Sequence, residues 1–237
     1  MTVDILAIAA HPDDIELSAA GLLARAHRAG YRAAAVDLTR GEMGTRGGAE
    51  QREAEAQAAA QVIGLGAREI LDLGDTRLTD THETRLAVAR KIREYRPRIV
   101  LAPYWLDRHP DHATASQLVS YGAFYARLPR IDLGIEIHAP RKILYYLQHE
   151  IPTPTMIVDI SDVWEIKRAA IECYQSQFGR DQAILPGYQF VGIADYLWGI
   201  EARARFYGSL IHAAYGEAYL VRDPIQIDDP VAFWAKE

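Results

Sequence analysis

The first 125 residues alternate short apolar runs with longer amphipathic segments. The apolar runs cover residues 4–10, 32–38, 69–73 and 98–103, and the segments with helical spacing cover 15–28, 49–63, 82–95 and about 110–125. Runs that are apolar throughout are typical of strands buried on both faces. Strands that alternate with helices at this spacing predict βαβ units. We therefore expect a Rossmann-like α/β fold, with a doubly wound, mainly parallel sheet of strand order 3-2-1-4-5.

The pattern after residue 130 is less regular. Strands are expected at 142–147 and 155–160, and helices at 162–177 and 199–214. The chain has 237 residues and shows neither an internal repeat nor a linker. This length suits one large domain, so we predict a single domain over 1–237 with an elaborated C-terminal third.

Composition narrows the class of protein. Hydrophobic residues make up 49% of the chain, charged residues 24%, and the formal net charge is -6. Non-specific binding to nucleic acid requires a concentrated positive surface, which this balance does not favour. Cys173 is the only cysteine, which fits a reducing compartment. No apolar run reaches the ~18–20 residues of a membrane span, and no signal peptide is evident. We expect a cytoplasmic protein with no nucleic-acid or membrane partner.

Two short motifs carry the chemistry. HPDD, residues 11–14, follows the first predicted strand, and HPDH, residues 109–112, follows the fourth. In the expected strand order, strands one and four are neighbours. Ligands of doubly wound folds bind at the carboxyl ends of such neighbours, where the strand order reverses. The two motifs should therefore meet in space, although about a hundred residues separate them.

The residue types in these motifs suit a catalytic metal site. Residues three apart share one face of a helical turn, so His11 and Asp14 can bind the same ion. One of His109 and His112 completes a set of two imidazoles and one carboxylate, which catalytic zinc sites and non-haem iron oxygenases both use. Spacing chooses neither between the two histidines nor between the two chemistries. Asp13 is then free to act as a general base.

The remaining histidine of the second motif could stabilise charge on the substrate, with Asp111 orienting it. The glycine-rich segment 40–48 lacks a phosphate-loop pattern and favours a loop over the pocket. Glu42 and Arg46 are its candidate substrate contacts. We interpret the other histidines as surface or core residues rather than ligands; they are His27, His82, His138, His149 and His212.

The sequence resembles a known family over essentially its whole length. The stretches AHPDDIE, DLTRGEMGTRG, QREAEAQAAAQVIG and HPDH are similar to those of the LmbE-like (PIG-L) family of zinc-dependent N-acetylglucosamine deacetylases. The stretches YQSQF and EARARFYG look most like its bacillithiol-biosynthesis branch, which hydrolyses N-acetylglucosaminyl-malate.

This resemblance implies roles for individual residues. It gives His11, Asp14 and His112 as zinc ligands, with Fe²⁺ able to occupy similar ligands. It also gives Asp13 as the general base and His109, paired with Asp111, as the residue that stabilises the tetrahedral intermediate.

The resemblance also implies substrate contacts. Arg52 matches an arginine near the metal, and Arg108 would suit the malate carboxylates through a bidentate pair. Tyr196 falls where relatives place a tyrosine that reaches the substrate carbonyl, here in the altered context GIADYLWGIEA. Relatives form trimers and hexamers, so a homo-oligomer is expected.

The expected reaction is hydrolysis of the N-acetyl group of N-acetylglucosaminyl-malate, which gives glucosaminyl-malate and acetate. One alternative is another acetylated sugar, such as a chitobiose, or a thiol conjugate. A second alternative is a metal-binding protein without activity, which the intact motifs disfavour.

Overall fold

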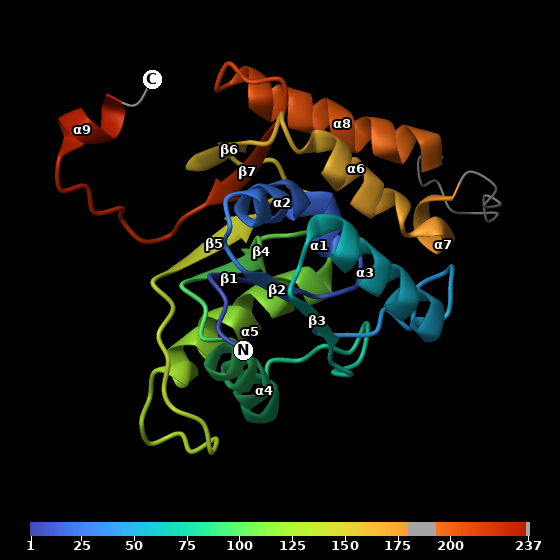
Figure 1. The fold of residues 1–237 in the computed structure, drawn as a ribbon. Helices are drawn as coiled ribbons and strands as arrows, with labels where there is room; N and C mark the ends of the chain where they lie inside the picture. Colours follow the sequence, from blue (N-terminus) through green and yellow to red (C-terminus); the bar gives the residue numbers. More distant parts are fainter. Residues whose placement is uncertain (180–192, 236–237) are drawn as a thin grey trace.

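A seven-stranded sheet forms the centre of the molecule in a computed structural model that describes residues 1–179 and 193–235 (Figure 1). The strands are β1 (Ile5–Ala9), β2 (Ala33–Asp37), β3 (Ala67–Ile70), β4 (Ile99–Pro103), β5 (Lys142–Tyr146), β6 (Met156–Asp159) and β7 (Gly216–Leu220). Their order is β3-β2-β1-β4-β5-β7-β6. Strands β1 to β5 pair in parallel, whereas β7 is antiparallel to both β5 and β6. The predicted doubly wound order 3-2-1-4-5 is confirmed.

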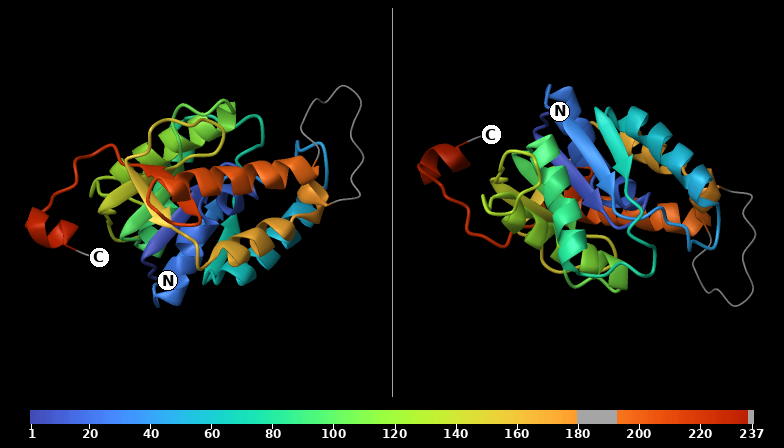
Figure 2. Two further views of the ribbon diagram at one scale, coloured as in Figure 1. Left: turned by 90° about the horizontal axis from the view of Figure 1, so that it is seen from above. Right: turned by 90° about the horizontal axis from the view of Figure 1, so that it is seen from below.

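Helices cover both faces of the sheet (Figures 1 and 2). They are α1 (Asp14–Ser18), α2 (Ala20–Arg28), α3 (Ala49–Ile63), α4 (His82–Tyr95), α5 (Pro110–Ala126), α6 (Trp164–Glu172), α7 (Gln175–Phe178), α8 (Ile193–Ser209) and α9 (Pro230–Trp234). Ile5 and Ala7 of β1 pack in one core with α2, α3 and α6, while Leu6 and Ile8 pack in the other with α4 and α5. This double burial explains why the strand is apolar at every position.

The C-terminal third departs from the expected pattern. The helix expected at 162–177 divides into α6 and α7, and α8 begins before the predicted 199–214 segment. Strand β7 was not expected, because Glu217 interrupts its apolar run. Glu217 is nevertheless buried, since its carboxylate accepts hydrogen bonds from the backbone N–H groups of Gly21 and Leu22. No helix in the described part of the chain is long and apolar enough to cross a membrane.

The first predicted helix, 15–28, is also divided. It breaks at Ala19, where φ is -138° and ψ is 0°, so that α1 is a separate turn directly after β1. A buried arginine anchors this turn to the sheet. Arg68 of β3 contacts Glu16 of α1 and lies 2.7 Å from the Asp37 carboxylate of β2, and all three side chains are fully buried. The cluster holds α1 in place beneath the carboxyl end of β1.

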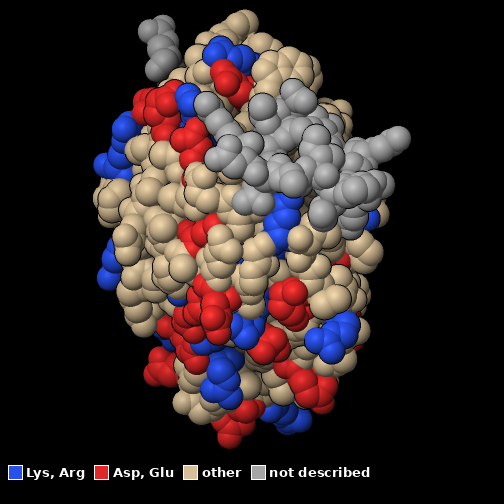
Figure 3. Space-filling model, turned by 90° about the vertical axis from the view of Figure 1, so that its right-hand side faces the viewer, with Lys and Arg blue, Asp and Glu red and all other residues tan. Residues whose placement is uncertain are grey.

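Charged side chains are interleaved on the surface. Figure 3 shows the right-hand side of the molecule as drawn in Figure 1, where acidic and basic groups lie among one another in its lower half. Neighbouring charges of opposite sign largely cancel at a distance, so the visible part of this face has no field of a single sign.

Candidate metal centre

The two motifs meet at the carboxyl ends of β1 and β4. His11 follows β1, and His109 is the N-cap of α5, with Pro110 at the first helical position. The ring centroid of His11 lies 4.8 Å from that of His109 and 5.4 Å from that of His112. The predicted meeting of the two motifs at the edge between neighbouring strands is confirmed.

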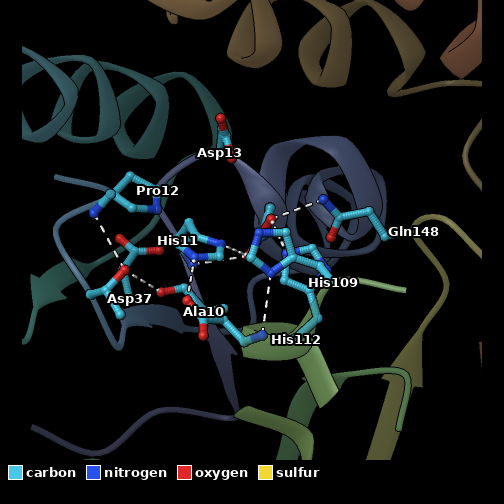
Figure 4. A network of polar contacts seen from close by, with 12 residues as sticks. Ala10, His11, Pro12, Asp13, Asp37, His109, His112 and Gln148 are labelled. Carbon is cyan, nitrogen blue, oxygen red and sulfur yellow. Dashed lines mark hydrogen bonds and ion pairs between the residues drawn. The ribbon is translucent and has the colours of Figure 1, made fainter. Parts of the chain in front are cut away.

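Asp14 lies between two imidazoles. Its Oδ2 is 3.6 Å from His11 Nδ1, and its Oδ1 is 3.2 Å from His112 Nε2. The backbone N–H of His11 donates to Oδ2 at 2.9 Å, and the Gln148 side-chain amide donates to Oδ1 at 2.9 Å (Figure 4). Two ring nitrogens and one carboxylate therefore converge on a small volume.

The far nitrogen of each imidazole contacts another carboxylate. His11 Nε2 lies 3.1 Å from Asp75 Oδ1 and 3.2 Å from Asp111 Oδ2. His112 Nδ1 lies 3.1 Å from Asp107 Oδ1. A carboxylate behind a histidine fixes the tautomer, so the lone pairs of His11 Nδ1 and His112 Nε2 face Asp14. This nitrogen and oxygen donor set fits Zn²⁺ and also Fe²⁺.

The charge balance of the cluster also fits a cation. Four carboxylates surround the two imidazoles, and their side chains are only 1–6% exposed: Asp14, Asp75, Asp107 and Asp111. Two protonated imidazoles would still leave an excess of negative charge, which is costly to bury. Burial lowers the pKa of His112, but the nearby Asp14 and Asp107 raise it to about 9. The cluster therefore favours positive charge at its centre.

Distance alone does not select the third ligand. The ligand atoms of His11, His109 and His112 all lie within 4.8 Å of one another. The outer contacts differ, however. His112 has Asp107 behind it and Asp14 in front, whereas His109 Nδ1 accepts from the backbone N–H of Asp111 at 3.2 Å.

The expected pairing of Asp111 with His109 needs a correction. The Asp111 carboxylate contacts His11 and accepts from the backbone N–H of Thr76 at 2.8 Å. Among the contacts of the described residues, Asp111 meets His109 through its backbone N–H and not through its carboxylate. Because Asp111 lies in the first turn of α5, its side chain points across the sheet edge toward β1 rather than back toward the N-cap. Its carboxylate therefore orients His11.

Asp13 is separated from its neighbour Asp14 by an unusual backbone turn. Its φ is 105°, a left-handed conformation that is strained for a residue with a side chain. Figure 4 shows Asp13 set apart from the histidine cluster. Burial raises the pKa of Asp13 to about 7, although the Arg52 guanidinium opposes this shift.

Arg52 braces this turn. Its Nη2 lies 3.0 Å from Asp13 Oδ2 and also donates to the carbonyl of Pro12, while its Nη1 donates to the carbonyl of Gly41 at 3.1 Å. The residue is 5% exposed. The structure therefore shows Arg52 as a support for Asp13, and the substrate contact expected for Arg52 stays a prediction.

Glu42 lies behind the site rather than in it. Its Oε1 accepts from the backbone N–H of Asp75 at 2.8 Å, and Asp75 Oδ2 accepts from the backbone N–H of Met43 at 2.9 Å. These reciprocal bonds tie the loop after β2 to the loop that carries Asp75. Through Oε1, Glu42 therefore helps to hold Asp75 against His11, and the substrate contact expected for Glu42 stays a prediction.

The other two predicted substrate contacts occupy the edge of the site. Arg108 is exposed on the turn between β4 and α5. Tyr196 of α8 stacks on Phe178, with 5.4 Å between ring centroids. Burial raises the pKa of Tyr196 to about 12, and Asp13 adds to this shift, so the phenol lies within electrostatic reach of the proposed base.

Sequence reasoning missed part of the site, namely Asp75, Asp107, Gln148 and His149. His149 was interpreted as a surface or core residue, but its Nδ1 lies 2.9 Å from Asp107 Oδ1, and its ring stacks on His112 at 5.3 Å. One signal was available. Gln148 and His149 follow β5, the strand next to β4, so they belong to the same edge of the sheet.

Fold and site together define an α/β enzyme with a histidine–carboxylate cluster at the reversal point of its sheet. The family model of GlcNAc-PI de-N-acetylase, PIG-L, matches residues 6–121. A diacetylchitobiose deacetylase of Thermococcus kodakarensis is 36% identical over 192 residues, which cover 75% of this chain and 71% of that protein. The chain belongs to the PIG-L family of de-N-acetylases, which are hydrolases of amide C–N bonds.

Solved structures share this fold. The conserved protein TT1542 from Thermus thermophilus superposes with a TM-score of 0.89 and 34% identity, with both chains covered completely. An N,N'-diacetylchitobiose deacetylase from Pyrococcus horikoshii superposes with a TM-score of 0.80 and is 28% identical in sequence. The match covers 92% of this chain and 82% of that one. GalB, a 4-carboxy-2-hydroxymuconate hydratase from Pseudomonas putida, shares the fold at 0.80 and 23% identity, covering 97% of this chain and 99% of that one.

Proposed function

We propose that this chain is a metal-dependent deacetylase of N-acetylated amino sugars, with His11, Asp14 and His112 as its metal ligands. One observation carries the proposal. Each of the two imidazoles contacts a buried carboxylate through one nitrogen and faces Asp14 with the other. The family supplies the reaction class, because its members cleave amide bonds.

A bound divalent cation would polarise the acetamide carbonyl and make water more acidic. Asp13 would accept the proton of the attacking water, since the left-handed turn directs its carboxylate away from the ligands and Arg52 fixes its position. Water adds to the carbonyl carbon, the C–N bond breaks, and the amine leaves after protonation by Asp13 or His109. The products are acetate and the free amino sugar.

We assign to His109 the stabilisation of the negative charge that develops on the carbonyl oxygen of the substrate. Its Nδ1 accepts a hydrogen bond from the backbone N–H of Asp111, so the proton of the neutral ring lies on Nε2. That N–H is then available as a donor to a developing negative oxygen. We include Tyr196 as a second donor, because it falls where relatives place a tyrosine that can reach the substrate carbonyl.

For the substrate we propose N-acetylglucosaminyl-malate. Support comes from the stretches YQSQF and EARARFYG and from Arg108, whose exposed guanidinium at the edge of the site suits a dicarboxylate. Diacetylchitobiose is the competing substrate, supported by the Thermococcus relative. Acetate release from both compounds separates the two. Arg108→Gln should raise KM for the malate conjugate and leave KM for the chitobiose unchanged.

Two variants test the division of roles at the metal centre. Asp13→Ala should keep the metal and lose turnover by ~10²–10⁴-fold, the usual contribution of a general base. His11→Ala should lose the metal as well as the activity. Metal content is measured by atomic spectroscopy on the purified proteins. Equal metal content in the two variants would contradict this assignment of ligand and base.

We also propose that the chain forms a homo-oligomer, expected to be a trimer or hexamer. The segment after β7 ends in α9, in which no residue is buried and which lies apart from the body (Figures 1 and 2). Val231 and Trp234 are each 77% exposed, and large apolar groups of this kind are typical of contact surfaces. Light scattering should show a larger assembly for the native chain than for Trp234→Asp.

A further inference from the structure

A small polar cavity lies beside the metal centre, between α1, α6, α8 and β7. Its walls include Ser18, Leu147, Lys167, Arg203, Tyr207 and Glu217. Its volume is about 20 Å³. A cavity needs ~10–15 Å³ on this scale to hold one water molecule, so the space suits a single small occupant.

Two hydroxyl groups in the cavity wall lack partners. Ser18 Oγ and Tyr207 Oη are both buried, and neither makes a hydrogen bond within the described residues. The two residues are only 4% and 3% exposed. A buried hydroxyl without a partner is costly. Ser18 and Tyr207 belong to different helices but line the same cavity. The cavity is therefore built to hold something that hydrogen-bonds to both.

The charges in the wall indicate the sign of the occupant. Lys167 contacts the carboxylate of Glu217, and Arg203 lines the same cavity. This carboxylate is already well supplied with donors, because it accepts from two backbone N–H groups, from Lys167 and from the hydroxyl of Tyr219. Lys167 is 2% exposed and has three N–H donors, one of which contacts Glu217. The wall thus carries two cations and one saturated carboxylate.

We propose that this cavity binds a monovalent anion of the size of chloride or bromide. The anion would accept hydrogen bonds from the two unpartnered hydroxyls and balance the second cation of the wall. A water molecule could bond to the hydroxyls but would leave that charge unbalanced.

The site connects to the metal centre through the protein. Ser18 ends α1, the turn that begins with the proposed ligand Asp14. Arg203 donates to the carbonyls of Leu17 and Gln148, and the Gln148 side chain donates to Asp14 at 2.9 Å. An anion that fixes the position of Arg203 would therefore also help to fix Gln148, which contacts Asp14. The anion site stands on its own residues and does not depend on the proposed substrate.

Melting curves in sodium chloride, bromide and gluconate at equal ionic strength test the site. Binding to the folded state alone should raise Tm by ~2–4 °C in chloride or bromide relative to gluconate. Tyr207→Phe should abolish most of this rise and leave Tm in gluconate unchanged or higher, because it removes an unpartnered hydroxyl. Ser18→Ala should behave in the same way. Tyr121→Phe, at an exposed tyrosine of α5, is the matched control and should keep the full rise.

Crystals soaked in bromide provide the second readout. An anomalous peak between Lys167 Nζ and Tyr207 Oη would support the anion site. The absence of such a peak, together with equal Tm values in the three salts, would show that the cavity holds only water and would overturn the proposal. A rise in Tm that Tyr207→Phe and Tyr121→Phe both retain would also overturn it, because the anion would then bind elsewhere.

Discussion

Asp107 offers the sharpest test of the proposed metal centre, because it contacts the site without being a proposed ligand. Its Oδ1 lies 3.1 Å from His112 Nδ1 and 2.9 Å from His149 Nδ1, and it accepts from the backbone N–H of His109 at 2.9 Å. Asp107→Asn keeps the size of the side chain and one oxygen. It removes the negative charge and places an amide group near one of these donors.

The expected loss is one of metal affinity. Removing a carboxylate behind a metal-binding histidine typically weakens the metal by ~10–100-fold, or ~1.4–2.7 kcal/mol. The Asp107 side chain is 1% exposed, so solvent screens its interaction with His112 very little. The hydrogen bonds of His112 and His149 hold the pKa of Asp107 below its usual range despite its burial, so the carboxylate is charged in the native protein. We therefore expect a loss near ~100-fold, the upper end of this range.

Competition with a chromogenic chelator measures this affinity directly. Asp162→Asn is the matched control, because Asp162 is half-exposed and pairs with Arg25 on the surface. A melting curve in the absence of metal establishes that Asp107→Asn is folded. If the variant binds metal as tightly as the native protein, His112 does not need its outer carboxylate, and the choice of His112 over His109 loses its main support.

Three further predictions follow from the supports of the site. Arg68→Met leaves two carboxylates buried without their partner and should lower the free energy of unfolding by ~3–5 kcal/mol in urea melts, whereas the exposed Arg25→Met should cost less than ~1 kcal/mol. Gly41→Ala should reduce kcat by ~10²-fold without loss of metal, because φ is +64° and a Cβ would lie 2.2 Å from Arg52 Nη1. A metal-loaded variant with native kcat would refute this role. Burial alone would raise the pKa of Glu69, but hydrogen bonds from Lys91 and Tyr95 hold this pKa below its usual value. A depressed carboxyl pKa stabilises the protein above the unfolded pKa, and this stability is lost as pH falls through the folded value. Tm should therefore fall less for Glu69→Gln than for the native protein between pH ~5 and ~3.

The N-terminal half of the fold follows from hydrophobic pattern alone. Helices α3 and α4 have the predicted bounds, because each is a long amphipathic segment between clear apolar runs. The pattern failed where a buried strand contains a charge. Glu217 interrupts β7, and its burial depends on N–H groups of α2 that lie almost two hundred residues away in sequence. No local signal reports such a partner.

The candidate site likewise contains residues that the sequence pattern predicts and residues that it does not. The motif histidines and Asp14 were predictable, because their spacing is set by one helical turn after a strand. The outer carboxylates were not. Asp75 lies in an irregular loop and reaches His11 only because Glu42 holds that loop from another part of the chain. Asp107 lies in the turn before α5, where an acidic residue is expected as an ordinary turn former.

One backbone turn separates the two chemical roles that we propose for the HPDD motif. Asp13 and Asp14 are adjacent carboxylates, and in a regular helix their like charges would compete for the same cation. The left-handed conformation of Asp13 directs one carboxylate to Arg52 and leaves the other between His11 and His112. Such a conformation costs ~1–3 kcal/mol, and the ion pair with Arg52 offsets part of it. Strain at this position is therefore the physical condition for having the proposed metal ligand and the proposed general base side by side in sequence.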